Sequence, residues 1–238
     1  MKDFKKYFLA AIIIIIVLAS IALRIKNGVS DNKQISSSMD SISSAQAQSY
    51  LAEQFPKIET GEYIIGSSDA RLKIFVYEDY SSIYSAYLSD TLERIKEEFG
   101  KDIAIIVRPH VSRNSSLSSE NALAIYCAGE QGKWLETRKY FFDQIKSREI
   151  GEPIAADYGE NLGLDNAKFN FCLTNAQKSA KIEQLVASSE NYGVLGAPTI
   201  FIGSEMILGA RPYDDFVDSN SDKIEGLKTV VARKLSEL

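Results

Sequence analysis

Residues 72–100 read LKIFVYEDYSSIYSAYLSDTLERIKEEFG, and this stretch decides the fold. The segment 72–77 is mainly β-branched and aromatic, and it follows the turn-like Gly66-Ser67-Ser68-Asp69, so it predicts a strand. Apolar residues then recur at the spacing of a helix over 82–99, and Gly100 is a suitable helix stop. These apolar positions are Tyr84, Leu88, Leu92, Ile95 and Phe99. The stretch therefore predicts a buried strand that leads directly into an amphipathic helix.

The chain beyond this helix continues a mixed α/β pattern. Residues 103–107 form a near-continuous apolar run, which is typical of a strand covered on both faces. Strand, helix and strand in this order predict a right-handed parallel crossover. The later elements that we expect are helices over 122–126, 134–145, 153–162 and from 166 onward, strands over 199–203 and 206–209, and a final helix from about Tyr213 to the C-terminus.

The N-terminal segment predicts insertion into a membrane. Lys2, Lys5 and Lys6 precede an apolar run over residues 8–23, close to the ~17 residues that a membrane-spanning helix needs. Basic residues on its amino side favour a cytoplasmic N-terminus and export of the remainder. A small-x-small sequence, Ser20-Ile21-Ala22, leaves cleavage and secretion open. We expect residues 1–27 to form a cytoplasmic stub and a single-pass transmembrane signal-anchor in the cell membrane, with the C-terminal domain extracytoplasmic.

The exported part divides into a tether and one domain. Residues 28–58 are largely rich in Ser, Gln, Asn and Asp and predict a flexible tether, whereas residues 59–238 suffice for a single domain. A net charge of −5, without a Lys/Arg cluster in this part, argues against nucleic acid as a partner. Since the sequence has neither a phosphate-cradling glycine loop nor a spaced His/Cys set, we expect no cofactor and no metal.

Five short motifs, in order along residues 61–238, resemble the DsbA-like branch of the thioredoxin superfamily. They are Gly66-Ser67-Ser68-Asp69-Ala70, Glu78-Asp79-Tyr80, CAGEQGKW over 127–134, Phe171-Cys172-Leu173, and Gly196-Ala197-Pro198-Thr199 followed by Ile200-Phe201-Ile202-Gly203. The resemblance implies a thioredoxin fold into which a helical domain is inserted, at about residues 115–191. Its usual activity is thiol-disulfide exchange.

The chain departs from this family at the active-site turn. Where the family has two cysteines that flank, as a rule, a proline and one other residue, this sequence has Ser82-Ile83-Tyr84-Ser85. Thiol-disulfide exchange requires an attacking thiolate, which neither serine can supply. The resemblance also implies a cis peptide bond before Pro198, facing this turn beside a peptide groove. The candidate groove residues are Tyr84, Ala197, Pro198 and Thr199.

The residues of the turn admit other interpretations. Ser82, His110 and either Asp79 or Glu78 would supply the groups of a hydrolase, although no Gly-x-Ser-x-Gly elbow supports that arrangement. The alternative is that Ser81 or Ser82 caps the helix. Glu78 and Asp79 are expected as solvated carboxylates facing the positive end of the helix. Tyr84 is either packed on the domain or an exposed aromatic contact, and the sequence favours neither.

Cys127 and Cys172 are the only cysteines, and export would place them where disulfides persist. A disulfide between them would close a loop of about 45 residues and stabilise the fold by roughly 4 kcal/mol. Some DsbA-like relatives carry a non-catalytic disulfide in this domain, which favours a structural role. The alternative is a redox couple, but the pair lacks the Cys-x-x-Cys spacing that lowers a thiol pKa.

The sequence thus predicts a protein that is redox-inactive at the usual site. We expect it to bind cell-envelope or secreted proteins or peptides in the groove. One alternative is a thiol-disulfide oxidoreductase by descent, acting through Cys127 and Cys172. Another is a structural module of the envelope that uses the fold as a head on its tether.

Overall fold

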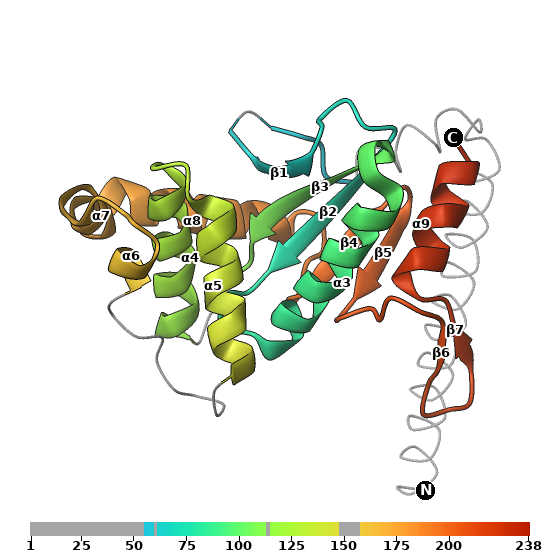
Figure 1. Ribbon diagram of the computed structural model, residues 1–238. Coiled ribbons are helices and arrows are strands. Elements are labelled where there is room, and N and C mark those ends of the chain that lie inside the picture. Colours follow the sequence, from blue (N-terminus) through green and yellow to red (C-terminus); the bar gives the residue numbers. More distant parts are fainter. Residues whose placement is uncertain (1–54, 60, 113–114, 148–157) are drawn as a thin grey trace, which may run out of the picture. The chain divides into compact units, whose positions relative to one another are not determined.

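The computed structural model describes residues 55–59, 61–112, 115–147 and 158–238 (Figure 1). The expected membrane segment 8–23, and the expected tether up to residue 54, lie outside these residues. Within them, no helix has both the length and the apolar character needed to cross a bilayer.

The centre of the molecule is a five-stranded sheet with the order β1-β3-β2-β4-β5 (Figure 1). Its strands are β1 (Tyr63–Gly66), β2 (Leu72–Glu78), β3 (Ile103–Pro109), β4 (Thr199–Ile202) and β5 (Glu205–Leu208). The neighbours β2 and β3 are parallel, with Leu72 opposite Ile103 and Glu78 opposite Pro109. Helix α3 (Ile83–Phe99) joins them, which confirms the expected strand-helix-strand unit. The antiparallel edge strand β1 was not predicted from the sequence.

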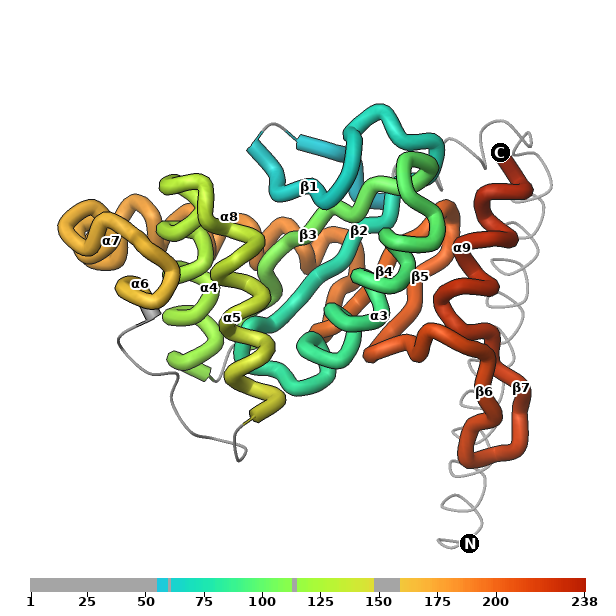
Figure 2. The backbone as a smooth tube through the Cα atoms, in the orientation of Figure 1, coloured from blue at the N-terminus to red at the C-terminus, as the bar shows by residue number. Residues whose placement is uncertain are grey.

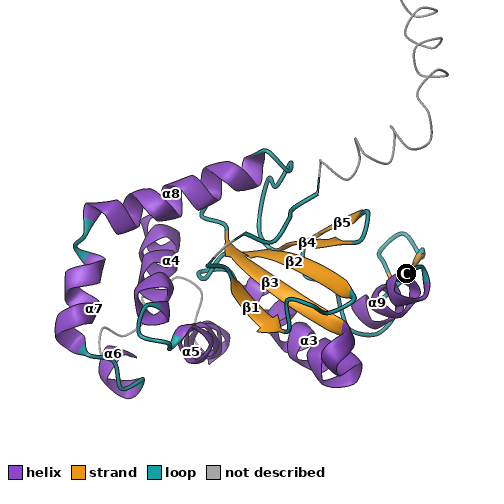
Figure 3. Ribbon diagram, turned by 90° about the horizontal axis from the view of Figure 1, so that it is seen from above, coloured by secondary structure: helices purple, strands orange, loops and turns teal. Residues whose placement is uncertain are grey.

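Alternation along the strands builds a core on each face of the sheet. Ile74 and Val76 point to the larger core, on the face that α3 and α9 (Leu227–Ser236) cover (Figure 3). Phe75 and Tyr77 point to a smaller core on the opposite face. There the ring of Phe55 packs edge-on against Phe201 at 5.8 Å between centroids. The folded domain therefore includes Phe55, which precedes the expected boundary at residue 59.

A helical insertion separates β3 from β4 in the sequence. Its helices are α4 (Ser116–Gly129), α5 (Trp134–Ser147), α6 (Tyr158–Asn161), α7 (Asn166–Leu173) and α8 (Ala176–Glu190). Figure 2 shows the chain leaving the sheet after β3, building this bundle, and returning along α8 to β4. The helical signal expected from residue 166 onward is two helices, because the Asn175 side chain accepts a hydrogen bond from the backbone N–H of Gln177 and starts a new helix.

The C-terminal segment corrects one expectation. Instead of a helix from Tyr213, a short hairpin forms from β6 (Phe216–Val217) and β7 (Lys223–Ile224), and α9 starts only at Leu227. The Asp218 carboxylate accepts hydrogen bonds from the backbone N–H groups of Asn220 and Asp222. These local bonds favour a turn over a helix, as aspartate side chains commonly do.

Candidate functional site

Two serine hydroxyls hold the turn between β2 and α3. Ser82 is the N-cap of α3, and its Oγ accepts a hydrogen bond from the backbone N–H of Ser85 at 3.4 Å. Ser85 is fully buried, and its Oγ accepts a bond from the backbone N–H of Asp79 at 3.2 Å. The capping interpretation is therefore confirmed at Ser82. Both hydroxyls therefore accept hydrogen bonds from the backbone of the turn.

A cavity of about 590 Å³ opens beside this turn. Its polar lining comes from Asp79 after β2, Ser82 at the start of α3, His110 and Ser112 after β3, and Glu190 at the end of α8. Its apolar lining includes Val111, Val194, Leu195 and Ala197. A volume of this size lies within the range of ligand-binding pockets, about 300–1,000 Å³. A pocket of ligand size therefore lies beside the turn between β2 and α3.

The peptide bond between Ala197 and Pro198 is cis, as the resemblance implies. Ala197 lines the cavity, whereas Pro198 and Thr199 are buried, and the Thr199 hydroxyl donates to the carbonyl of Gly196 at 2.7 Å. Tyr84 lies 63 % exposed on the first turn of α3 and does not line the cavity. The four groove candidates thus have different places: one in the wall, two behind it and one on the surface.

The residues of the hydrolase interpretation, Ser82, His110 and Asp79, line one cavity, but hydrogen bonds do not connect these described residues into a catalytic set. The Asp79 carboxylate accepts bonds from the backbone N–H and hydroxyl of Ser81, at 2.8 and 2.6 Å. His110 Nδ1 lies 3.3 Å from the Ser189 hydroxyl. Among the described residues, no hydrogen bond connects His110 to Ser82 or to Asp79. Burial lowers the pKa of His110, although Asp79 and Glu190 oppose the shift, so the ring is neutral at pH 7.

In the described part of the chain, no group of three or more His, Cys, Asp or Glu side chains could hold a metal ion.

The expectation of a solvated Glu78 is wrong. Its carboxylate is fully buried and bound by both arms of the Arg138 guanidinium, at 2.8 Å from Nε to Oε2 and 2.5 Å from Nη2 to Oε1. Burial by itself lowers the pKa of Arg138, but the charge and hydrogen bonds of Glu78 outweigh burial and raise it. Asp79 is also buried, at 7 % exposure. Sequence reasoning missed Arg138, which falls on the apolar face of α5 between Trp134 and Phe142.

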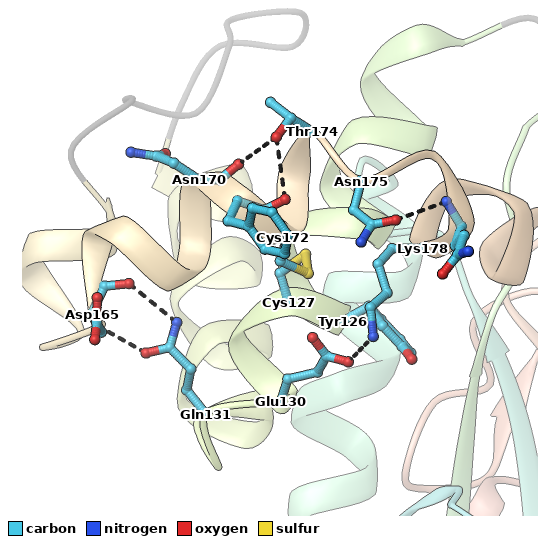
Figure 4. The surroundings of a disulfide bond; sticks show 12 residues. Tyr126, Cys127, Glu130, Gln131, Asp165, Asn170, Cys172, Thr174, Asn175 and Lys178 are labelled. Carbon is cyan, nitrogen blue, oxygen red and sulfur yellow. Dashed lines mark hydrogen bonds and ion pairs between the residues drawn. A yellow bond between two sulfur atoms is a disulfide. The ribbon is translucent and has the colours of Figure 1, made fainter.

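Cys127 of α4 and Cys172 of α7 form a disulfide within the insertion (Figure 4). Their Cα atoms are 5.7 Å apart, and the side chains are 1 % and 5 % exposed. Polar contacts surround the bond: Gln131 bonds to the backbone of Asp165, and Lys178 pairs with Glu130. The bond is therefore enclosed by its own domain and lies on different elements from those that line the Ser82 cavity.

Comparisons with known proteins agree with this architecture. A family model described as Thioredoxin matches residues 59–219. Among solved structures, the thiol-disulfide exchange protein alpha-DsbA2 from Wolbachia pipientis superposes with a TM-score of 0.59 at 17 % identity, over 79 % of this chain and 92 % of that one. The catalytic domain of Proteus mirabilis ScsC gives 0.58 at 21 % identity, over 80 % and 98 %.

The chain is also similar to part of a longer curated protein. The Na(+)/H(+) antiporter NhaA of Herminiimonas arsenicoxydans is 26 % identical over 155 residues, which are 64 % of this chain and 24 % of the antiporter. The chain thus spans about a quarter of the curated relative it matches. Because the family model covers more than half of the sequence, the chain belongs to the thioredoxin family, with Ser82 and Ser85 at the turn between β2 and α3.

Proposed function

We propose that this protein binds an extended peptide or a protein partner in the cavity beside Ser82 and Ala197, without thiol chemistry at residues 82 and 85. The observation that carries the proposal is the pairing of a pocket of ligand size with a turn whose two hydroxyls are both committed to backbone groups. A binding surface remains at this site, while its usual reactive group is absent.

The cavity walls favour a polypeptide as the ligand. Leu195 is 90 % exposed at the wall, next to Gly196 and Ala197, so an apolar side chain and a segment of loop backbone stand open to solvent. Contacts of both kinds are what an extended peptide uses, because its main chain supplies hydrogen bonds and its side chains fill pockets. The partners are cell-envelope or secreted proteins, on the further proposal that residues 8–23 anchor the chain in the membrane.

Thiol-disulfide exchange is the competing function, because it is the named activity of structural relatives such as alpha-DsbA2. In this chain both cysteines lie in the Cys127–Cys172 bond, and burial keeps their sulfur atoms away from an attacking thiolate. This arrangement favours binding over exchange.

The test blocks the cavity and measures binding. A Cβ added at Gly196 meets no atom within 4 Å, so Gly196→Trp places an indole in the cavity without a clash at its root. The matched control is Lys101→Trp, at an exposed position after α3. We expect captured envelope proteins, identified after in-cell crosslinking, to be lost from Gly196→Trp and kept in the control. Equal capture by both variants, or insulin reduction by the native protein, would refute the proposal.

A further inference from the structure

A second cavity, of about 490 Å³, lies between α4 and α8. Its lining includes Leu123 from α4 and Ile182, Val186 and Ala187 from α8. Ile182 is buried, whereas Leu123 and Val186 are half-buried, so the floor is apolar and partly open. The groove belongs to the helical insertion.

This groove continues the cavity beside Ser82. Val111 and Glu190 line both cavities, so the two meet where β3 ends and α8 ends. Figure 3 shows α8 running from α7 past α4 to the sheet, which is the path that the groove follows. A ligand in the first cavity therefore has an apolar channel in which to extend, along the side of α8.

The rim of the groove carries negative charge. Glu120, Glu183 and Glu190 line it, and all three are exposed. Neither Glu120 nor Glu183 forms an ion pair within the described part of the chain. Asp79 adds a further carboxylate at the first cavity. Among the described residues that line the two cavities, none is a lysine or arginine. Charges of one sign along an apolar channel concentrate the field in it and attract ligands of the opposite sign.

We propose that the partner segment is cationic and apolar, with basic side chains that pair with the acidic rim and apolar side chains that fill the floor between α4 and α8. This inference rests on the proposed function, because it takes the ligand of the Ser82 cavity and extends it along α8. The commitment to a basic peptide follows from charge complementarity: an acidic segment would face at least two unpaired glutamates, and a wholly polar one would leave the apolar floor exposed.

The experiment uses the full-length protein in phosphatidylcholine nanodiscs, with empty nanodiscs as the blank. Fluorescence anisotropy measures three labelled peptides of equal length that alternate leucine with lysine, with glutamine or with glutamate. We expect the leucine-lysine peptide to bind roughly tenfold more tightly than the leucine-glutamate peptide, with an advantage that shrinks at high salt. Equal affinities for these two peptides would overturn the inference.

A pair of charge variants locates the effect. Glu120→Gln with Glu183→Gln keeps the shape of the groove and removes two charges, so we expect roughly fivefold weaker binding of the leucine-lysine peptide and little change for the leucine-glutamine peptide. The matched control is Asp69→Asn with Glu97→Gln, which removes two exposed carboxylates outside both cavities. Equal weakening by the control pair would overturn the inference.

Gly196→Trp separates the two proposals. If leucine-glutamine and leucine-lysine peptides bind alike and Gly196→Trp abolishes both, the proposed function stands and the cationic preference falls. If the glutamate variants weaken binding but Gly196→Trp does not, the groove binds cationic peptide and the Ser82 cavity is not part of the site. If no peptide binds the native protein, the cationic groove is refuted, while the capture experiment with Gly196→Trp still decides the proposed function.

Discussion

The start of α3 and the helical insertion differ in their use of cysteine. At the start of α3, where the family resemblance expects two cysteines, the chain has Ser82 and Ser85. In the insertion, Cys127 and Cys172 remain and are bonded to each other. A hydroxyl can replace a thiol in capping a helix or in accepting a backbone hydrogen bond, but it cannot form a crosslink. Sulfur is thus present where it joins two helices, and absent where a hydroxyl suffices to hold the turn.

The comparison also shows what maintains the turn. Ser82 and Ser85 bond to its backbone, the buried pair of Glu78 and Arg138 fixes the end of β2 to α5, and the cis bond before Pro198 shapes the opposite wall. None of these interactions involves sulfur. Hydrogen bonds, an ion pair and backbone geometry therefore hold this turn.

The largest expected effect comes from returning sulfur to the turn. Ser82→Cys with Ser85→Cys would place one thiol at the N-terminus of α3, where the helix lowers a thiol pKa from about 8.5 by about one unit or more. We expect the pair to oxidise in glutathione buffer and insulin reduction to rise from background to a measurable rate. The control is Ser82→Cys alone, which lacks the resolving thiol. Two thiols that stay reduced in oxidised glutathione would show that the turn no longer has the geometry for exchange.

The second prediction removes one partner of the ion pair that links the two regions. Arg138→Met leaves the Glu78 carboxylate buried and unpaired, so we expect the free energy of unfolding to fall by about 3–5 kcal/mol. Urea denaturation measures the change. Lys139→Met, at a neighbouring side chain that is 57 % exposed, should change stability by less than about 1 kcal/mol.

A second variant keeps that prediction testable if the first fails to fold. Replacing both partners, Glu78→Leu with Arg138→Met, removes the buried charge altogether and should recover most of the lost stability. Equal destabilisation by Arg138→Met and Lys139→Met would mean that the pair does not hold the insertion to the end of β2.

The third prediction concerns the disulfide between Cys127 and Cys172. Cys127→Ala with Cys172→Ala should lower the free energy of unfolding by about 2–4 kcal/mol, because the unfolded chain regains the freedom of a loop with a sequence separation of 45. Reductant should destabilise the native protein by a similar amount and leave the variant unchanged. A native protein that loses no stability once its disulfide is reduced would contradict the structural role and favour a redox one.

The sequence predicted the fold well because its signals are local and strong. The strand at 72–77, the helix over 82–99 and the apolar strand at 103–107 all follow from periodicity and composition, and the structure confirms them. The prediction for the C-terminal segment failed because the Asp218 side chain bonds to nearby backbone, which competes with a helix in a way that periodicity does not show.

The site was harder to predict because its charged residues pair with partners that are far away in the sequence. Glu78 was expected in solvent, facing the positive end of the helix, but Arg138 lies 60 residues later in the sequence and pairs with it in the core. A basic residue on the apolar face of α5 was the available signal. The cavity shared by Asp79, His110 and Glu190 depends on how the insertion packs back onto the sheet, which no local pattern encodes.

The smallest expected effect is on the pH dependence of stability, and it reports whether the insertion, packed on the sheet, buries His110. Burial lowers the pKa of His110 below its ordinary 6.5, so the folded state binds fewer protons than the unfolded state once the pH falls below that value. The stability that depends on a neutral His110 is thus fully present above pH 6.5 and is lost as the pH falls toward the lowered pKa. Asp79 and Glu190 favour the protonated ring and limit the loss.

The urea midpoint should therefore fall further between pH 7.5 and pH 5.5 for the native protein than for His110→Asn, because the variant lacks the imidazole that titrates. Ser85→Ala, which removes a hydroxyl from the same turn, should keep the native pH dependence while losing stability at both values. If the native protein and His110→Asn respond alike, burial of His110 by the insertion contributes nothing to the pH dependence of stability.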